Sequence, residues 1–163
     1  MSQGRAPFAV LGLGNELFTD EGVGVQAAHL VGAAGLPGVE VLDGGTLGLA
    51  LLPALEGRRG LLILDAVVAE GSEPGDLIEL TAEELVKPRM LLMSAHQVGI
   101  AETLGAASLL GTSPEMLHAV GMVPFSLDTG YGLSEDAQER LPQMVERALA
   151  VLDSWNVGAP VHA

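Results

Sequence analysis

The chain has 163 residues, of which 48% are apolar, 21 are acidic and 7 are Lys or Arg, and its formal net charge at pH 7 is -14. This length and apolar content fit one ordinary domain with a sizeable core. The acidic surplus argues against nucleic acid and anionic membranes as partners, because no segment carries enough basic side chains to neutralise a run of phosphates. Since the chain has no Cys, any bound metal must be held by His and carboxylate side chains.

The N-terminal stretch "MSQGRAPFAVLGLG" does not have the features of a signal peptide. It carries one Arg and a short apolar run, which continues into a glycine loop instead of ending at a small-residue cleavage site. No apolar run approaches the roughly 18 to 20 residues of a membrane-spanning helix. We therefore expect a soluble, cytoplasmic protein with no membrane partner.

Short runs rich in Val, Ile and Leu alternate with longer segments of helical periodicity, which is typical of a mostly parallel sheet with helices on both faces. The predicted strands are Phe8–Leu13, Val39–Leu42, Leu61–Leu64, Leu77–Leu80 and Met116–Met122, and the predicted helices are Asp20–Ala34, Leu47–Leu55, Gln97–Leu110 and Ser134–Trp155. The sequence therefore predicts an α/β fold, with a twisted, mostly parallel sheet of about five strands sandwiched between helices. One domain spans residues 1–163, with a core from about 7 to 155 and a frayed C-terminal tail.

The first predicted strand leads into a glycine loop and then into two acids. Gly12 and Gly14 match the first two glycines of a dinucleotide-binding fingerprint, but Leu17 replaces the third. Asp20 and Glu21 at the start of the next helix would repel a phosphate bound to the same amide groups. These acids favour a cation over a nucleotide. The alternative is that they only complement the helix dipole, and Asp20 is either a helix cap or a support for its neighbour.

Two further carboxylates follow strands that should be buried. Asp43 ends the strand in "VEVLDGGT", and Asp65 ends the strand in "LLILDAV". Because the carboxyl ends of parallel strands line the binding crevice of an open sheet, we expect Asp43, Asp65 and the turn containing Glu21 to converge there.

Two helix starts carry capping-box patterns. Thr81 with Glu84, and Ser94 with Gln97, pair a hydroxyl with a longer polar side chain three residues on. The second box places His96 in the first turn of its helix, where the helix dipole favours the neutral imidazole that can bind a metal. Together with two or three carboxylates, this imidazole predicts a site suited to nickel, zinc or a similar divalent ion.

Other chemistry-bearing residues have simpler interpretations. Asp128 lies in "LDTGYG", which contains the Asp-Thr-Gly triplet of pepsin-like proteases. Those enzymes need two such aspartates on a largely β scaffold, so we expect a loop and cap before the last helix. His29, His118 and His162 have no ligand neighbour at short spacing, and we expect them to be structural or exposed.

The stretches "GLGNELFTDEGVG", "LDGGTLG", "LDAV" and "SAHQVG", in this order, make the chain resemble the hydrogenase maturation proteases. These endopeptidases trim the C-terminal extension from the large subunit of nickel-iron hydrogenases. The resemblance runs from Phe8 to about Trp155 and includes "GMVPFSLDTGYGLS" before the final helix. It implies a twisted sheet between helices and a peptidase that acts on the immature large subunit, and since family members can act as monomers, we expect a monomer.

The same resemblance implies roles for four residues. Glu21, Asp65 and His96 would bind a divalent metal, the nickel already loaded into the substrate, and Asp43 matches a further acid near the site. We expect these four residues to form the catalytic set, with no nucleotide cofactor. The cleavage step stays open, because the ion could polarise the carbonyl group or activate water, with Asp43 as general base.

Two other functions remain as alternatives. One is a metal-sensing chaperone that recognises the same precursor without cutting it. The other is a nucleotide-binding α/β domain, which would need a phosphate on the loop from Gly12 to Asn15.

Overall fold

The computed structural model describes residues 4–45, 51–86 and 95–157. Within them, one sheet has the strand order β2-β1-β3-β5-β4. The strands are β1 (Phe8–Leu13), β2 (Val39–Gly45), β3 (Gly60–Ala66), β4 (Leu77–Thr81) and β5 (Met116–Met122). Four of them run parallel, and β4 pairs antiparallel with β5 at one edge. The prediction of a mostly parallel, five-stranded sheet is confirmed.

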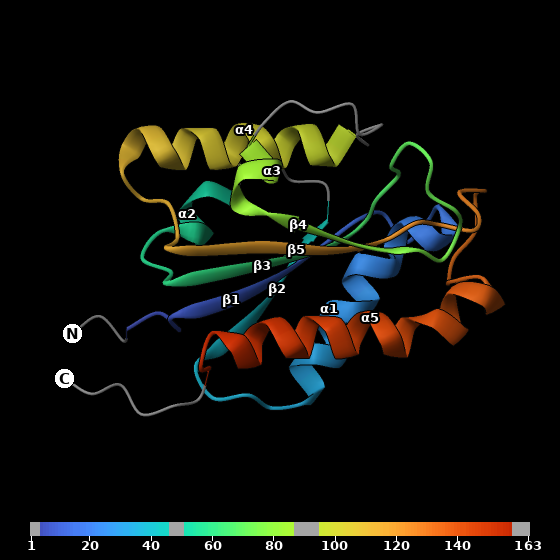
Figure 1. The fold of residues 1–163 in the computed structure, drawn as a ribbon, viewed down its shortest axis with the longest axis horizontal. Coiled ribbons are helices and arrows are strands. Elements are labelled where there is room, and N and C mark those ends of the chain that lie inside the picture. The colour runs from blue at the N-terminus through green and yellow to red at the C-terminus, as the bar shows by residue number, and fades with distance from the viewer. Residues whose placement is uncertain (1–3, 46–50, 87–94, 158–163) are drawn as a thin grey trace.

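Helices cover both faces of this sheet (Figure 1). Helices α1 (Val23–Ala33) and α5 (Glu135–Ser154) lie on one face, and α2 (Leu52–Leu55), α3 (Ala82–Val86) and α4 (Ala95–Leu110) lie on the other. A short 3-10 helix, η1 (Thr19–Gly22), precedes α1. None of the helices in the described part of the chain is long and apolar enough to cross a membrane.

The core is divided between the two faces because side chains alternate along each strand. Val10, Leu62 and Leu64 pack in a cluster with α1 and α5. Leu11, Leu61 and Ile63 pack in a second cluster with α2 and α4. The alternation continues to the strand ends, so Asp65 at the end of β3 lies on the face of Leu61 and Ile63, which is covered by α4.

The first helix differs from its prediction. A continuous helix was expected over Asp20–Ala34, but residues Thr19–Gly22 form η1 and the α-helix begins at Val23. Thr19 has a positive φ of 50°, and its backbone N–H donates to Gly130 at 2.9 Å. This backbone conformation and the hydrogen bond to Gly130 keep residues Thr19–Gly22 out of α-helical geometry, so the α-helix begins only at Val23.

The other helices deviate at their ends. Of the predicted helix Leu47–Leu55, the structure describes α2 from Leu52, and residues 46–50 lie outside the described residues. For helix α3 only the start was predicted, without a range, and its capping box is confirmed in part, because Thr81 N donates to Glu84 Oε2 at 3.1 Å. Ser94 of the second box lies outside the described residues.

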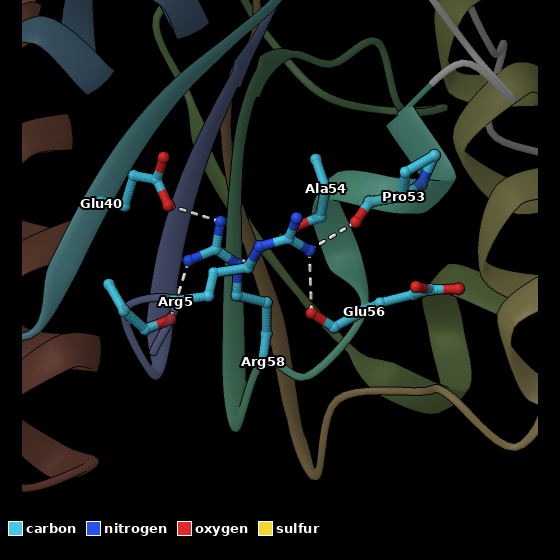
Figure 2. A network of polar contacts seen from close by, with 7 residues as sticks. Arg5, Glu40, Pro53, Ala54, Glu56 and Arg58 are labelled. Atoms are coloured by element: carbon cyan, nitrogen blue, oxygen red, sulfur yellow. Dashed lines mark hydrogen bonds and ion pairs between the residues drawn. The ribbon is translucent and has the colours of Figure 1, made fainter. Parts of the chain in front are cut away.

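A buried arginine organises the amino edge of the sheet, away from the predicted site. The Arg58 side chain is 2% exposed and pairs with Glu40 at 2.5 Å. Its guanidinium also donates to Ala6 O at 2.7 Å and Ala54 O at 3.0 Å. Figure 2 shows these contacts beside those of Arg5, which donates to the carbonyl groups of Pro53 and Glu56. This network fastens the start of β1 to β2 and α2.

Candidate active site at the carboxyl edge of the sheet

Glycines allow the segment after β1 to fold tightly over the carboxyl edge of the sheet. Gly14 has a φ of 128°, and a Cβ there would lie 1.8 Å from the carbonyl oxygen of Glu21. A Cβ on Gly24 would lie 2.2 Å from Leu64 O and 2.5 Å from Leu13 O. The glycines therefore serve close backbone packing, which presses η1 and the start of α1 against the ends of β1 and β3.

This packing brings two of the predicted ligands to the same edge. Asp65 is 4% exposed, and its Oδ1 accepts a hydrogen bond from Ala66 N at 2.8 Å. Glu21 is half-buried in η1, and η1 contacts β3. A buried carboxylate and a half-buried one therefore lie on neighbouring elements.

His96 is the second residue of α4, so its helical position is as predicted. Helix α4 begins toward the end of the sheet where the parallel strands finish (Figure 1), and it covers the face on which Asp65 lies. The side chain of His96 lies outside the described residues. Among the described side chains, no group of three or more His, Cys, Asp or Glu is arranged to hold a metal. The convergence of Glu21, Asp65 and His96 therefore stays a prediction.

Asp43 occupies a different place at this edge. It pairs in register with Gly12 of β1, which separates β2 from β3, so its Cα lies about 10 Å across the sheet from the end of β3. Alternation along β2 directs Asp43 to the face of Val39 and Val41, opposite the face of Asp65. Asp43 is exposed. It is thus accessible to a ligand.

An open cleft of about 330 Å³ lies beside Asp43. Its described lining consists of the glycine loop, one position of α1, Asp43 and one aromatic residue from the segment before α5: Gly14, Asn15, Glu16, Leu17, Val25, Asp43 and Tyr131. Sequence reasoning missed Glu16, Leu17 and Tyr131. A usable signal was that Tyr131 is the single Tyr in the chain and follows a glycine in a segment expected to be a loop.

Asp20 fastens the two segments that border the cleft, a role that the sequence left undecided. Its side chain is fully buried. Oδ2 accepts hydrogen bonds from Phe125 N and Ser126 N, both at 3.0 Å, and from Ser134 Oγ at 2.8 Å. Oδ1 accepts one from Ser134 N at 2.8 Å. Since Ser134 also caps α5 by accepting from Ala137 N at 3.2 Å, Asp20 supports the start of α5 and not that of its own helix.

A second set of hydrogen bonds joins the segment of residues 17–19 to the segment of residues 128–130. Phe18 and Gly130 form a parallel bridge, in which Gly130 N donates to Leu17 O and Thr19 N donates to Gly130 O, both at 2.9 Å. Thr19 Oγ1 donates to the backbone carbonyl of Asp128 at 2.6 Å. Asp128 itself is exposed in the loop before α5, as expected.

His118 and His29 fit their predicted structural or surface positions. His118 Nε2 lies 3.2 Å from Glu79 Oε1, which belongs to a surface cluster with Arg147. His29 is exposed on α1. His162 lies outside the described residues.

Comparisons with known proteins point to one family. The family profile described as "Hydrogenase maturation protease" matches residues 26–151. The hydrogenase 2 maturation protease of Escherichia coli is 38% identical over 152 residues, which cover 92% of this chain and 93% of that protein. The solved structure of the hydrogenase maturating endopeptidase HybD from E. coli superposes with a TM-score of 0.83 at 34% identity and covers 92% of this chain and 94% of that one. A [NiFe] hydrogenase maturation protease HybD from Thermococcus kodakarensis superposes with a TM-score of 0.75 at 28% identity, over 88% and 97% of the two chains.

Proposed function

The chain belongs to the hydrogenase maturation protease family and is a peptidase, and from this premise we propose that it removes the C-terminal extension of a nickel-iron hydrogenase large-subunit precursor after nickel insertion. The observation that carries the proposal is the packing of η1 against the end of β3. This packing brings Glu21 and Asp65 to the carboxyl edge of the sheet. Helix α4, which carries His96, begins toward the same edge (Figure 1).

The donor atoms of these three residues fit nickel. Two carboxylates and one imidazole form a mixed oxygen and nitrogen set of the kind that divalent nickel accepts. We assign Glu21, Asp65 and His96 as ligands to the nickel of the substrate. A precursor without nickel would lack this contact, so cleavage becomes conditional on metal insertion.

Asp43 is assigned a separate chemical role. Its exposed carboxylate at the cleft accepts a proton from a water molecule as the water oxygen bonds to the scissile carbonyl carbon. Collapse of the tetrahedral intermediate breaks the C–N bond, and the proton passes to the leaving amine. General bases of this kind contribute typically about 10²- to 10⁴-fold to the rate.

The test is cleavage of a purified nickel-loaded precursor, measured as loss of the extension by mass spectrometry. We expect the parent protein to cut this precursor and to leave the nickel-free form intact. Asp43→Asn retains binding and loses cutting, whereas Asp65→Asn loses both. Asp153→Asn, an equivalent change at an exposed position of α5, cuts like the parent.

The same experiment separates the peptidase from a chaperone. Binding of the nickel-loaded precursor without any cutting by the parent protein would contradict the assignment and favour a metal-sensing chaperone.

We also propose that the protein works as a monomer without a nucleotide. Gly12 packs closely on the backbone of α1 and Gly14 on the carbonyl of Glu21, which explains the glycines of the loop without a phosphate ligand. Equilibrium dialysis with dinucleotides tests whether the protein binds a nucleotide, and tight binding to the loop would contradict this part of the proposal.

A further inference from the structure

Exposed apolar side chains concentrate beside the cleft. Seven large apolar residues are exposed in the described part of the chain, and four of them lie on the two hydrogen-bonded segments before η1 and before α5. They are Leu17, Phe18, Leu127 and Tyr131, with exposed fractions of 60%, 39%, 51% and 78%, and we call them the apolar rim. Clustered apolar residues at a surface mark interaction sites more often than scattered ones do.

The aromatic residues of the chain strengthen this observation. The sequence has only five, and Phe8, Phe125 and Trp155 pack in the structure, the first stacking on the third with ring centroids 6.2 Å apart. Phe18 and Tyr131, the two exposed aromatic residues, both belong to the rim. Aromatic side chains contribute a disproportionate share of the binding energy at protein interfaces.

The rim is ordered before any partner binds. Leu17 and Phe18 are held to Gly130 by the backbone bridge, and the buried carboxylate of Asp20 holds Phe125 and Ser126, just before Leu127. A surface that is already fixed loses little conformational entropy on binding, so more of its contact energy appears as affinity.

The rim continues into the cleft, and the cleft indicates what binds. Leu17 and Tyr131 line the cleft together with Asp43 and Glu16. Its described lining thus has two carboxylates and no basic residue, in a chain of net charge -14. Charge complementarity therefore favours a partner segment with basic side chains, and the exposed rim favours apolar ones beside them.

We propose that the apolar rim and the cleft together dock an extended segment of the substrate protein that carries both apolar and basic side chains. The inference rests on the proposed function, because it takes the cleaved precursor as the partner. The rim binds the apolar side chains, and Glu16 attracts the basic ones, while Asp43 keeps its role as general base. Docking on this surface adds a contact to the precursor that does not depend on its nickel.

The test compares the double variant Leu17→Ser/Tyr131→Ser with Leu109→Ser/Leu110→Ser, which removes two exposed leucines at the end of α4. Steady-state cleavage of the nickel-loaded precursor gives KM and kcat for each double variant. Fluorescence anisotropy gives the Kd of the uncut precursor when each double variant also carries Asp43→Asn. We expect the rim variant to raise KM and Kd by about tenfold or more, as loss of interface anchors does. Its kcat and melting temperature stay those of the parent, and the α4 variant changes neither KM nor Kd.

An unchanged KM and Kd in the rim variant would overturn the inference even though the parent cuts the precursor. If the parent does not cut, the proposed peptidase fails, and the Kd values alone decide the docking surface. A Kd of the Asp43→Asn protein for the precursor that does not weaken as salt is raised would refute the basic character of the segment.

Discussion

Replacing Asp20 by Asn is expected both to destabilise the protein and to weaken the attachment between η1 and the segment before α5, which border the cleft. The change removes one negative charge and puts an NH₂ group where one carboxylate oxygen accepts hydrogen bonds. Because Oδ2 accepts three bonds and Oδ1 accepts one, the amide keeps its oxygen toward Phe125, Ser126 and Ser134 Oγ. The NH₂ group then faces the backbone N–H of Ser134, which loses its acceptor.

The magnitude follows from this geometry. A buried donor left without an acceptor costs about 1–3 kcal/mol, and the three remaining bonds weaken because a neutral acceptor is roughly half as effective as a charged one. Relief from burying a charge offsets part of this loss. We expect a net loss of about 3 kcal/mol in the free energy of unfolding, or about 6–12 °C in melting temperature for a domain of this size.

Thermal unfolding followed by circular dichroism measures the change, with Asp153→Asn as the exposed control. Precursor cleavage by the same variant should show a higher KM, because η1 and the segment of Tyr131 lose their shared anchor. An Asp20→Asn protein that melts within about 1 °C of the parent would refute the proposed role of the carboxylate.

Gly24→Ala should lower the free energy of unfolding by about 3 kcal/mol or more, because its Cβ would meet backbone oxygens that cannot move aside. Gly105→Ala in α4, with no neighbour within 4 Å, should be neutral or stabilising by up to about 1 kcal/mol. Equal melting temperatures of the two variants would contradict the close packing of Gly24 on the strand ends. Arg58→Met should lower stability by about 2–3 kcal/mol, since the Ala6 and Ala54 carbonyls and Glu40 lose their donor, while KM for the precursor stays unchanged because the network lies at the amino edge. A raised KM in the folded Arg58→Met protein would show that the two edges are coupled. Asp43→Asn should reduce kcat by about 10²-fold or more and leave the melting temperature unchanged, and a kcat close to that of the parent would exclude the residue as general base.

The strands were the most predictable part of the fold. β1 and β5 match their predicted bounds, because a continuous apolar run between turn residues has few ways to be buried except as an inner strand. β2 and β3 extend further than predicted, through Asp43 and Asp65 to Gly45 and Ala66. Polar residues at a strand end interrupt the hydrophobic pattern while their backbone still pairs.

The function of Asp20 and the cleft lining could not be predicted in the same way. The partners of Asp20 lie 105 to 114 residues away, so no local pattern distinguishes its carboxylate from an ordinary acid at a helix start. The cleft likewise joins Glu16 and Leu17 to Tyr131 across a contact made only in the folded chain. The position of Asp43 and Asp65 at the carboxyl edge could be predicted from sequence, because the ends of parallel strands meet at that edge by a rule of the fold.

Anomalous diffraction from crystals of the protein soaked with Ni²⁺ shows whether Glu21, Asp65 and His96 meet around one cation. We predict one strong peak at the carboxyl edge of the sheet, bonded to side-chain atoms of these three residues. A peak bound elsewhere, or these three side chains ordered but pointing away from one another, would contradict it.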